Sequence, residues 1–437
     1  MEERHRNLLV KQNPWWQKKE QALPSFERDM LETLEKHMKY KQIIAITGLR
    51  RTGKTVMLKQ IIRKLDVREN NICYISFDDL DFQKYTTAED LINYFLEFSD
   101  KSQMRYLFLD EIQKLAGWQD LLKTYYDTED RLKIFVSGSS SLEIKNSKET
   151  LDGRILTFHL RVLSFSEFAR YHGMEHRITE KTLFREYDLK FAGKKEQYGR
   201  LFERYLVKGA FPELLDIDDE EYIRKYIRES VIEKSIADIS KIAKEDEKVI
   251  YELLRLLMNS NARLFEIVNL SGILKINRNL VSGYITLLEK SFLIKITYNF
   301  TASVAKQVRS NKKQYGTHSS IIIALLDYPS SIINTEIVGH MVEGVVANHI
   351  EKAAFWRSPQ NDEIDIVAKE SGRLVPIEIK YQSQITKNDL KPMIKFAEKF
   401  KTSKGMIVTK NTLEKQTAGG MEILLIPAWL FLLMRDA

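Results

Sequence analysis

The chain contains very little cysteine: Cys73 is the only one in 437 residues. A single thiol excludes a disulfide within the chain and a zinc site built from several cysteines. Cys73 lies in the apolar segment 71–77, which predicts a strand, so we expect it to be a buried packing residue. The reducing cytoplasm is the simplest compartment for such a chain.

The sequence also lacks long hydrophobic runs. An apolar stretch near the end, 423–434, is too short to cross a bilayer and contains Pro427. We expect it to form a strand followed by a packed helix. The N-terminal residues contain no apolar core of a secretory signal. We therefore expect a cytoplasmic location and no membrane partner.

Acidic residues are fewer than basic ones, although the difference is small. Lys and Arg number 68 against 61 Asp and Glu, which gives a formal net charge of +7. This balance favours an anionic partner but does not by itself indicate nucleic acid. The hydrophobic fraction of 43% is sufficient for packed cores, and the length suggests about three domains.

A phosphate-binding loop is the most informative feature that is present. Residues 48–55 fit the pattern G-x-x-x-x-G-K-[ST] at every fixed position, between a strand pattern at 43–46 and a helix pattern at 56–62. Backbone N–H groups of such a loop, with the helix N-terminus, hold phosphate oxygens. Lys54 would reach the β- and γ-phosphates, and the Thr55 hydroxyl would bind Mg²⁺. The expected nucleotide-binding residues are Gly48, Leu49, Arg50, Arg51, Thr52, Gly53, Lys54 and Thr55.

An acidic pair follows a second apolar strand pattern at 106–109. Asp110 is predicted to hold the Mg²⁺ through water, and Glu111 to act as general base toward the attacking water. No Asn-Lys-x-Asp tetrad that would read guanine occurs in the sequence. ATP and ADP are therefore expected in preference to guanine nucleotides.

Strand and helix patterns alternate from about 41 to 160, as in a parallel α/β sheet. The strand at 132–137 would lie between the strands of the phosphate loop and of the acidic pair, as in ATPases of the additional-strand class. A run of serines follows it. Ser139 is the candidate contact to the γ-phosphate or the attacking water, and the alternative is a plain polar loop.

Arg154 precedes the last strand of this region, 155–160. An arginine there can serve as a finger that stabilises transition-state charge on the nucleotide of a neighbouring subunit. That role would imply a homo-oligomer, with a ring as one arrangement. The alternative is a solvated surface group.

The region from about 161 to 245 is helical and charged in pattern, and 246–300 has the helix, turn, helix, strand order of a winged helix. Its candidate residues for a surface facing nucleic acid are Arg278, Asn279, Ser282 and Tyr284. The alternative is a winged helix that serves packing only. The basic stretch 302–320, which includes Lys313, is predicted to be an exposed connector or a mobile loop.

Four residues in the last third form a further constellation. Glu343 lies in a helix pattern at 338–350, Asp365 in a strand pattern, and Glu378 and Lys380 two apart on the next strand, so that they share a face. Residues of these types in this arrangement are typical of a metal-dependent phosphodiesterase. Asp365 and Glu378 would hold Mg²⁺ or Mn²⁺, and Lys380 would orient or activate water.

Two interpretations of these four residues do not involve catalysis. Glu-x-Lys on a strand is also typical of a salt-bridged surface, and folds of this kind often only bind DNA. The helix predicted after the second strand carries lysines suited to a phosphate backbone, among them Lys387 and Lys391.

Taken together, these motifs resemble archaeal and bacterial AAA+ (STAND-like) P-loop ATPases with a C-terminal uncharacterised domain of PD-(D/E)xK, restriction-endonuclease-like fold. The resemblance covers nearly the whole chain. The segments that carry it are 13–16, 48–55, 109–111, 138–140, 153–154, 163–168 and 209–213. Two departures are serines where the sensor position often has Asn, and Tyr315-Gly316-Thr317-His318 where relatives tend to read Tyr-x-x-Asp.

The resemblance implies an α/β multidomain chain. Its parts would be an N-terminal segment with a P-loop AAA+ ATPase core at 1–165, a helical lid or linker at 166–245, a winged helix at 246–305 and a nuclease-like α/β domain at 306–437. It assigns Lys54, Thr55, Asp110 and Glu111 to ATP and Mg²⁺, and Glu343, Asp365, Glu378 and Lys380 to the nuclease-like site.

The sequence therefore predicts an ATPase that binds DNA and cleaves it with a divalent metal. Two alternatives stay open. One is an ATP-gated switch or scaffold whose nuclease-like domain only binds DNA, and the other is a protein-remodelling ATPase.

Overall fold

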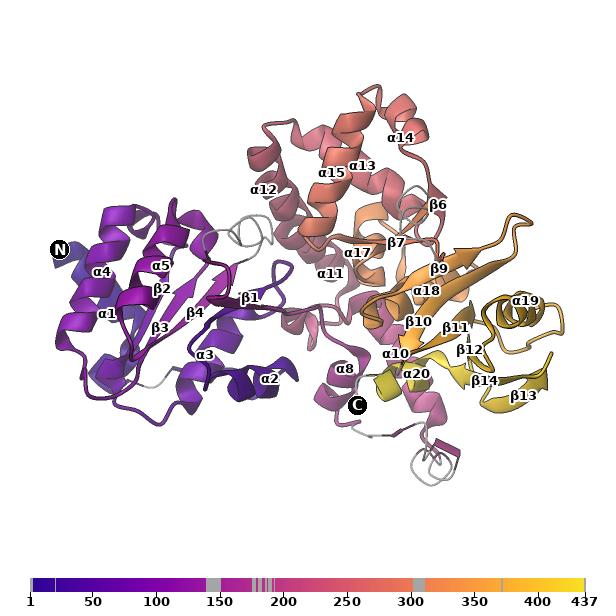
Figure 1. The fold of residues 1–437 in the computed structure, drawn as a ribbon, viewed down its shortest axis with the longest axis horizontal. Coiled ribbons are helices and arrows are strands. Elements are labelled where there is room, and N and C mark those ends of the chain that lie inside the picture. The colour runs from indigo at the N-terminus through magenta and orange to yellow at the C-terminus, as the bar shows by residue number, and fades with distance from the viewer. Residues whose placement is uncertain are drawn as a thin grey trace. The chain divides into compact units, whose positions relative to one another are not determined.

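The computed structural model describes residues 3–19, 21–138, 151–174, 178–179, 183–184, 187, 191, 193–301, 311–370 and 372–435. The chain divides into two compact units, Met1–Arg161 and Val162–Ala437 (Figure 1). Each is described by itself. The predicted division into four parts stays a prediction.

The first unit is built on a five-stranded parallel sheet. Its strand order is β2-β3-β4-β1-β5, so β4 lies between β3 and β1, as predicted for the additional-strand class. The strands are β1 (Ile43–Thr47), β2 (Ile72–Ser76), β3 (Arg105–Asp110), β4 (Leu132–Gly138) and β5 (Ile155–His159).

Helices cover both faces of this sheet (Figure 1). On β1, Ile43 and Ala45 join one apolar cluster while Ile44 and Ile46 join the other, because alternate residues of a strand face opposite sides. Helices α1 (Glu3–Gln12), α4 (Tyr85–Phe98) and α5 (Trp118–Thr128) pack on the first cluster, and α2 (Met30–His37) and α3 (Lys54–Lys64) on the second.

The second unit begins with helices, as the sequence predicts. They are α8 (Phe165–Tyr171), α10 (Lys195–Lys208), α11 (Glu220–Tyr226), a π-helical segment at Ile227–Glu233 and α12 (Lys234–Ala243). Ser164 caps α8 in a capping box. Its hydroxyl accepts from the Glu167 N–H, and the Glu167 carboxylate accepts from the Ser164 N–H.

A small three-stranded antiparallel sheet follows, with strand order β6-β8-β7. Its elements in chain order are α13 (Glu247–Asn259), β6 (Leu264–Phe265), α14 (Ile267–Leu274), α15 (Arg278–Lys290), β7 (Ile294–Tyr298) and β8 (Lys312–Gly316), after which comes α17 (Ser319–Leu326). The prediction of an exposed connector at 302–320 is wrong for its second half. Residues 302–310 lie outside the described residues, but Lys312–Gly316 is the central strand of this sheet, and Lys313 is 2% exposed.

The last part of the chain forms a six-stranded mixed sheet with order β13-β14-β12-β11-β10-β9. Helix α19 packs on one face, and α18 and α20 lie together on the other. The elements are α18 (Val338–His349), β9 (Ala354–Arg357), β10 (Glu363–Glu370), β11 (Arg373–Lys380), α19 (Lys391–Phe400), β12 (Lys404–Thr409), β13 (Glu414–Ala418), β14 (Met421–Pro427) and α20 (Ala428–Arg435).

Several sequence predictions for this part are confirmed, and one helix begins later in the chain than predicted. Strands β10 and β11 form the predicted antiparallel hairpin, and β14 with α20 forms the predicted strand and packed helix at the end. Helix α19 begins at Lys391, so Lys387 precedes the helix that was predicted to carry it. Within the described residues, no helix has the length and apolar character needed to cross a membrane.

Candidate functional site

The phosphate loop connects β1 to α3 at the carboxyl edge of the parallel sheet, and both of its glycines are required by the backbone. A Cβ at Gly48 would lie 2.3 Å from the carbonyl oxygen of Leu160. Gly53 stands at the N-cap of α3 with φ of 95°, a left-handed conformation that glycine adopts without strain. The tight turn is therefore built into the chain.

Lys54 folds back over this loop. Its Nζ donates to the carbonyl oxygens of Gly48 at 3.1 Å and of Leu49 at 2.9 Å, and the residue is 5% exposed. Burial lowers the pKa of Lys54, while the charges of Glu111 and Asp110 act in the opposite direction. The ammonium group is thus held inside the loop, within reach of phosphate oxygens placed there.

Asp110 ends β3 and accepts three hydrogen bonds from hydroxyl groups. Thr55 Oγ1 and the Tyr74 hydroxyl each donate to Oδ2 at 2.7 Å, and the Ser137 hydroxyl donates to Oδ1. Burial raises the pKa of the Asp110 carboxyl against these hydrogen bonds, which lower it. Thr55 and Asp110, the two predicted Mg²⁺ residues of this site, therefore meet in the structure and suit the ion.

Tyr74 and Ser137 are functional candidates that the sequence reasoning did not assign. Ser137 lies in β4, between β3 and β1 in the sheet, and its Oγ also accepts the Glu111 N–H at 3.2 Å. Its position at the start of the serine run was the available signal. Ser139, the predicted contact, lies outside the described residues.

Glu111 has a backbone conformation that is rare for a non-glycine residue, with φ of 55° and ψ of 42°. Such conformations cluster at functional sites. The side chain of Gln113 donates to Glu111 Oε2 at 2.6 Å. The carboxylate predicted to be the general base is therefore positioned by its own turn and by Gln113.

A buried arginine that the sequence analysis did not identify forms a hydrogen bond to the backbone of the phosphate loop. Arg28, two residues before α2, is 7% exposed. Its Nη1 donates to the Thr52 carbonyl oxygen at 2.9 Å and its Nη2 to the Arg161 carbonyl oxygen at 3.0 Å. Arg28 thus joins the phosphate loop to the last residue of the first unit.

Arg154, the predicted finger, lies at the amino end of the parallel strands, whereas the phosphate loop of its own chain lies at their carboxyl end. It precedes β5, which runs parallel to β1, whereas the loop follows β1. Its guanidinium forms two hydrogen bonds to Asp127 on α5, at 2.9 and 3.1 Å. Its action on a neighbouring subunit stays a prediction.

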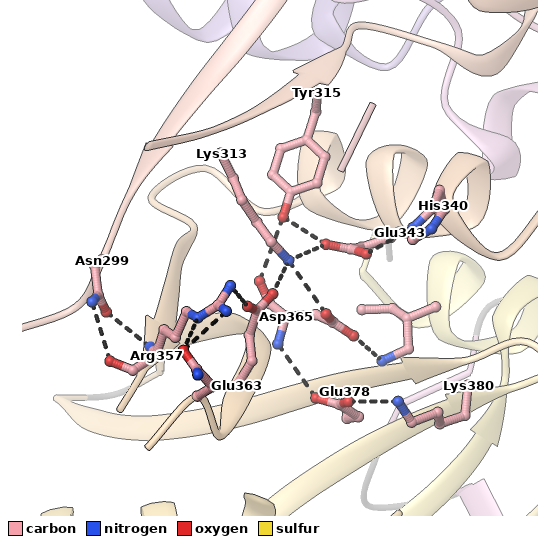
Figure 2. A network of polar contacts seen from close by, with 12 residues as sticks. Asn299, Lys313, Tyr315, His340, Glu343, Arg357, Glu363, Asp365, Glu378 and Lys380 are labelled. Atoms are coloured by element: carbon pink, nitrogen blue, oxygen red, sulfur yellow. Dashed lines mark hydrogen bonds and ion pairs between the residues drawn. The ribbon is translucent and has the colours of Figure 1, made fainter. Parts of the chain in front are cut away.

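The four residues of the C-terminal constellation also converge (Figure 2). The Asp365 N–H donates to Glu378 Oε2 at 3.3 Å, the Ile379 N–H donates to Asp365 Oδ2 at 2.9 Å, and Lys380 Nζ lies 2.9 Å from Glu378 Oε1. The register of β10 against β9 shifts between Ile364 and Val367, and such a bulge re-aims the side chains beside it. Asp365 lies in that shift.

Lys313 points into the middle of this group (Figure 2), although it was predicted to be exposed. Its Nζ lies 2.6 Å from Glu363 Oε1, 2.9 Å from Glu343 Oε1 and 3.4 Å from Asp365 Oδ1. The Tyr315 hydroxyl, from the same strand, donates to Glu343 Oε1 at 2.8 Å. Lys313 was missed because nothing local in the sequence marks a lysine as buried, and Tyr315 and Glu363 were not assigned to this site.

The electrostatics of this cluster follow from burial and close opposite charges. Burial alone would lower the pKa of Lys313, but the carboxylates of Glu343, Asp365 and Glu363 raise it well above its usual value. Burial, followed by the charge of Asp365, raises the pKa of Glu378 to about 8. Lys313 is therefore firmly protonated.

This arrangement does not fit the divalent metal that the resemblance implies. Its acids already interact with the cationic side chains of Lys313 and Lys380 or with backbone N–H groups. Among the residues that the structure describes, no three His, Cys, Asp or Glu side chains are grouped so that they could hold a metal ion.

The predicted nucleic-acid residues occupy two separate elements. Arg278, Asn279 and Ser282 are exposed on α15, whereas Tyr284 is 4% exposed and packs inward, so its assignment to that surface is wrong. Lys387 and Lys391 are also exposed, before and at the start of α19. Contact of any of them with DNA stays a prediction.

Three protein-family models match successive parts of the chain. Residues 40–169 match an AAA domain. Residues 199–331 and 337–430 match two domains of unknown function, DUF8612 and DUF4143. The ATPase prediction is thereby confirmed for the first unit at the level of an AAA-type domain.

Two proteins are similar to this chain in sequence over most of its length. An uncharacterised protein of Methanocaldococcus jannaschii is 27% identical over 408 residues, which covers 88% of this chain and 84% of that protein. An uncharacterised protein of Haemophilus influenzae is 22% identical over 419 residues, covering 89% and 94%.

Among solved structures, Caenorhabditis elegans PCH-2 gives a TM-score of 0.29 at 14% identity over 43% of this chain and 57% of that one. A Signal Transduction ATPase with Numerous Domains (STAND) protein from Pyrococcus horikoshii, with a tetratricopeptide repeat sensor, gives 0.26 at 12% identity over 74% and 45%. TM-scores this low do not establish a shared overall fold.

Proposed function

We propose that this chain, whose residues 40–169 form an AAA-type ATPase domain, is an ATP-driven switch that hydrolyses Mg²⁺-ATP to change how it engages DNA. The observation that carries the proposal is the meeting of Lys54, Thr55, Asp110 and Glu111 at one edge of the first sheet. ATP, ADP and Mg²⁺ are its expected ligands.

The chemistry follows from the donors and acceptors in place. Lys54 Nζ, now bound to two loop carbonyls, would donate to the β- and γ-phosphate oxygens. Mg²⁺, when bound, neutralises charge on the phosphates. Glu111 would accept the proton of the attacking water, and for this Gln113 must give up its hydrogen bond to Oε2. Ser137 keeps Asp110 and Glu111 in fixed relation.

Two features support the DNA part of the proposal. The order α13, β6, α14, α15, β7, β8, with β8 central in an antiparallel sheet, is consistent with a winged helix. The exposed face of α15 presents Arg278, Asn279 and Ser282 as candidate contacts. A helix, three antiparallel strands, a helix and a parallel strand, α18 to β12, favour a PD-(D/E)xK-like unit.

Binding without cutting is favoured over metal-dependent cleavage. The acids Glu343, Asp365 and Glu378 come together, as cleavage requires, but Lys313 and Lys380 neutralise them. We therefore retain DNA cleavage as the competing outcome and not as the proposed activity. Assembly into a homo-oligomer, with Arg154 acting on a neighbour, belongs to the same proposal and requires the Arg154–Asp127 pair to open.

The test compares wild type with Lys54→Ala and Asp365→Ala. ATP turnover is measured with Mg²⁺, and the binding of single-stranded, duplex and branched DNA is measured by anisotropy with ADP or a non-hydrolysable ATP analogue. A DNA affinity that differs between nucleotides, and no longer differs in Lys54→Ala, supports the switch. An affinity independent of nucleotide contradicts it.

The same assay separates the rival functions. Cleavage with Mg²⁺ or Mn²⁺ that is lost in Asp365→Ala would favour the nuclease. ATP turnover without binding to any of the DNAs would favour a protein-remodelling ATPase.

A further inference from the structure

We infer that the ammonium of Lys313 supplies the positive charge in the C-terminal acid cluster, in place of the divalent metal that the sequence predicts there. The cluster, formed by Glu343, Glu363 and Asp365 around Lys313, thereby holds strand β8 against the last sheet. This inference deepens the proposed function, because it gives the reason why a nuclease-like unit would bind DNA without cutting it.

The first argument is the match between donors and acceptors. A lysine ammonium has three N–H groups, and Lys313 Nζ has a carboxylate oxygen at 2.6, 2.9 and 3.4 Å, each from a different residue. The three acids come from α18 and β10 (Glu343, Glu363 and Asp365). The lysine side chain is 3% exposed, so bulk water has little access to its ammonium group.

The second argument is the balance of charge. The carboxylates around Lys313 are those of Glu343, Glu363 and Asp365. Their contacts include two cations, Lys313 and Arg357, whose Nη1 lies 3.2 Å from Glu363 Oε2. Buried charges are stable only when they are paired. The lysine therefore supplies charge that the acids need in the absence of a metal.

The third argument is that β8 is built to deliver this side chain. Lys313 and Tyr315 are two apart on the strand and share one face, and both reach Glu343. The intervening Gln314 donates to the Leu257 carbonyl, on α13. The strand pairs with β7 and β6. The cluster thus joins the three-stranded sheet to α18 and β10.

The consequence is testable without any enzymatic assay. As they stand, these acids are not grouped so that they could hold a metal ion, because the ammonium of Lys313 lies between them; once it is removed, we expect their oxygens to close on a divalent or trivalent hard cation. Lys313→Gln should therefore gain a metal site that wild type lacks. The matched control is Lys312→Gln, the neighbouring lysine, which alternates to the other face of β8.

Metal binding is measured on the full chain, without nucleotide or DNA, by Tb³⁺ luminescence excited through tyrosine and by thermal melting with Mn²⁺. Tyr315 lies at the cluster and serves as the antenna. All variants carry Asp110→Asn, which removes the carboxylate that is predicted to bind Mg²⁺ at the ATP site. We expect saturable Tb³⁺ luminescence and a melting temperature raised by Mn²⁺ in Lys313→Gln, neither in Lys312→Gln, and loss of both when Glu343→Gln is added.

Saturable Tb³⁺ binding by protein with Lys313 intact, abolished by Glu343→Gln, would overturn the inference, even if Lys313→Gln failed to fold. A folded Lys313→Gln that gains no metal binding would overturn it as well. Failure of the proposed ATP switch would change neither result, because neither ATP nor DNA is present.

Discussion

Asp110 in the first unit and Asp365 in the second are both strand carboxylates that the sequence assigns to Mg²⁺, but their surroundings differ. Asp110 accepts hydrogen bonds from the hydroxyls of Thr55, Tyr74 and Ser137. Asp365 lies beside the ammonium of Lys313. Hydroxyl donors orient a carboxylate without cancelling its charge, whereas an ammonium cancels it. Converging acids therefore indicate a metal only after the nearby cations are counted.

The largest expected effect is on the acid beside Asp110. Glu111→Gln removes the proposed general base, so ATP turnover should fall by roughly 10²- to 10⁴-fold, while nucleotide binding persists. Steady-state turnover and binding of a fluorescent ATP analogue measure the two. Glu97→Gln, an exposed acid on α4, is the matched control. Unchanged turnover in Glu111→Gln would remove the base assignment.

The counterpart in the second unit is a loss of stability. Lys313→Met leaves buried carboxylates without their cation and should lower the unfolding free energy of that unit by about 3–5 kcal/mol. Urea denaturation measures the change, and Lys312→Met is the control. Adding Glu343→Gln removes one of the stranded charges and should restore part of the loss. A Lys313→Met protein as stable as Lys312→Met would contradict the role of the lysine.

A smaller change tests the hydroxyl donors. Tyr74→Phe removes one of three donors to Asp110 and should weaken Mg²⁺-ATP binding by about 1 kcal/mol, roughly fivefold. Tyr125→Phe is the control, because its hydroxyl bonds to Asn93 elsewhere in the same unit. Isothermal titration of both variants gives the comparison. Equal Mg²⁺-ATP affinity in the two variants would mean that Tyr74 only packs.

The smallest effect concerns the proposed DNA surface. Arg278→Ala should weaken binding to all DNA sequences alike and reduce the slope of log affinity against log salt by about 1. Affinity measured at several salt concentrations gives the slope. Arg255→Ala, on α13 and paired with Glu252, is the control. A slope that is the same in both would exclude α15 from the phosphate contacts.

The sequence predicted the first unit well because its signals are local. A strand, a glycine loop, Lys54-Thr55 and a helix occupy adjacent positions, and the backbone at Gly48 and Gly53 admits only glycine without strain. The place of β4 between β3 and β1 was predicted from the likeness to ATPases of the additional-strand class. Tyr74 was missed because its hydroxyl reaches Asp110 from a neighbouring strand 36 residues away.

The second unit was predicted in its parts but not in its electrostatics. The helix and strands carrying Glu343, Asp365 and Glu378 were located by their apolar patterns, and these residues do meet. Lys313 was assigned to an exposed connector because it lies in a basic, polar stretch. Its burial depends on three carboxylates 30 to 52 residues further along the chain, which no local pattern contains.

Arg28 gives the first unit a mechanical property. One rigid, planar guanidinium bonds both to the carbonyl of Thr52 in the phosphate loop and to that of Arg161, where the chain leaves the unit. If the loop shifts as it closes on phosphate, either Arg161 follows or one of the two bonds breaks. The phosphate loop and the end of the first unit are therefore mechanically coupled through Arg28, so that a displacement of one is transmitted to the other.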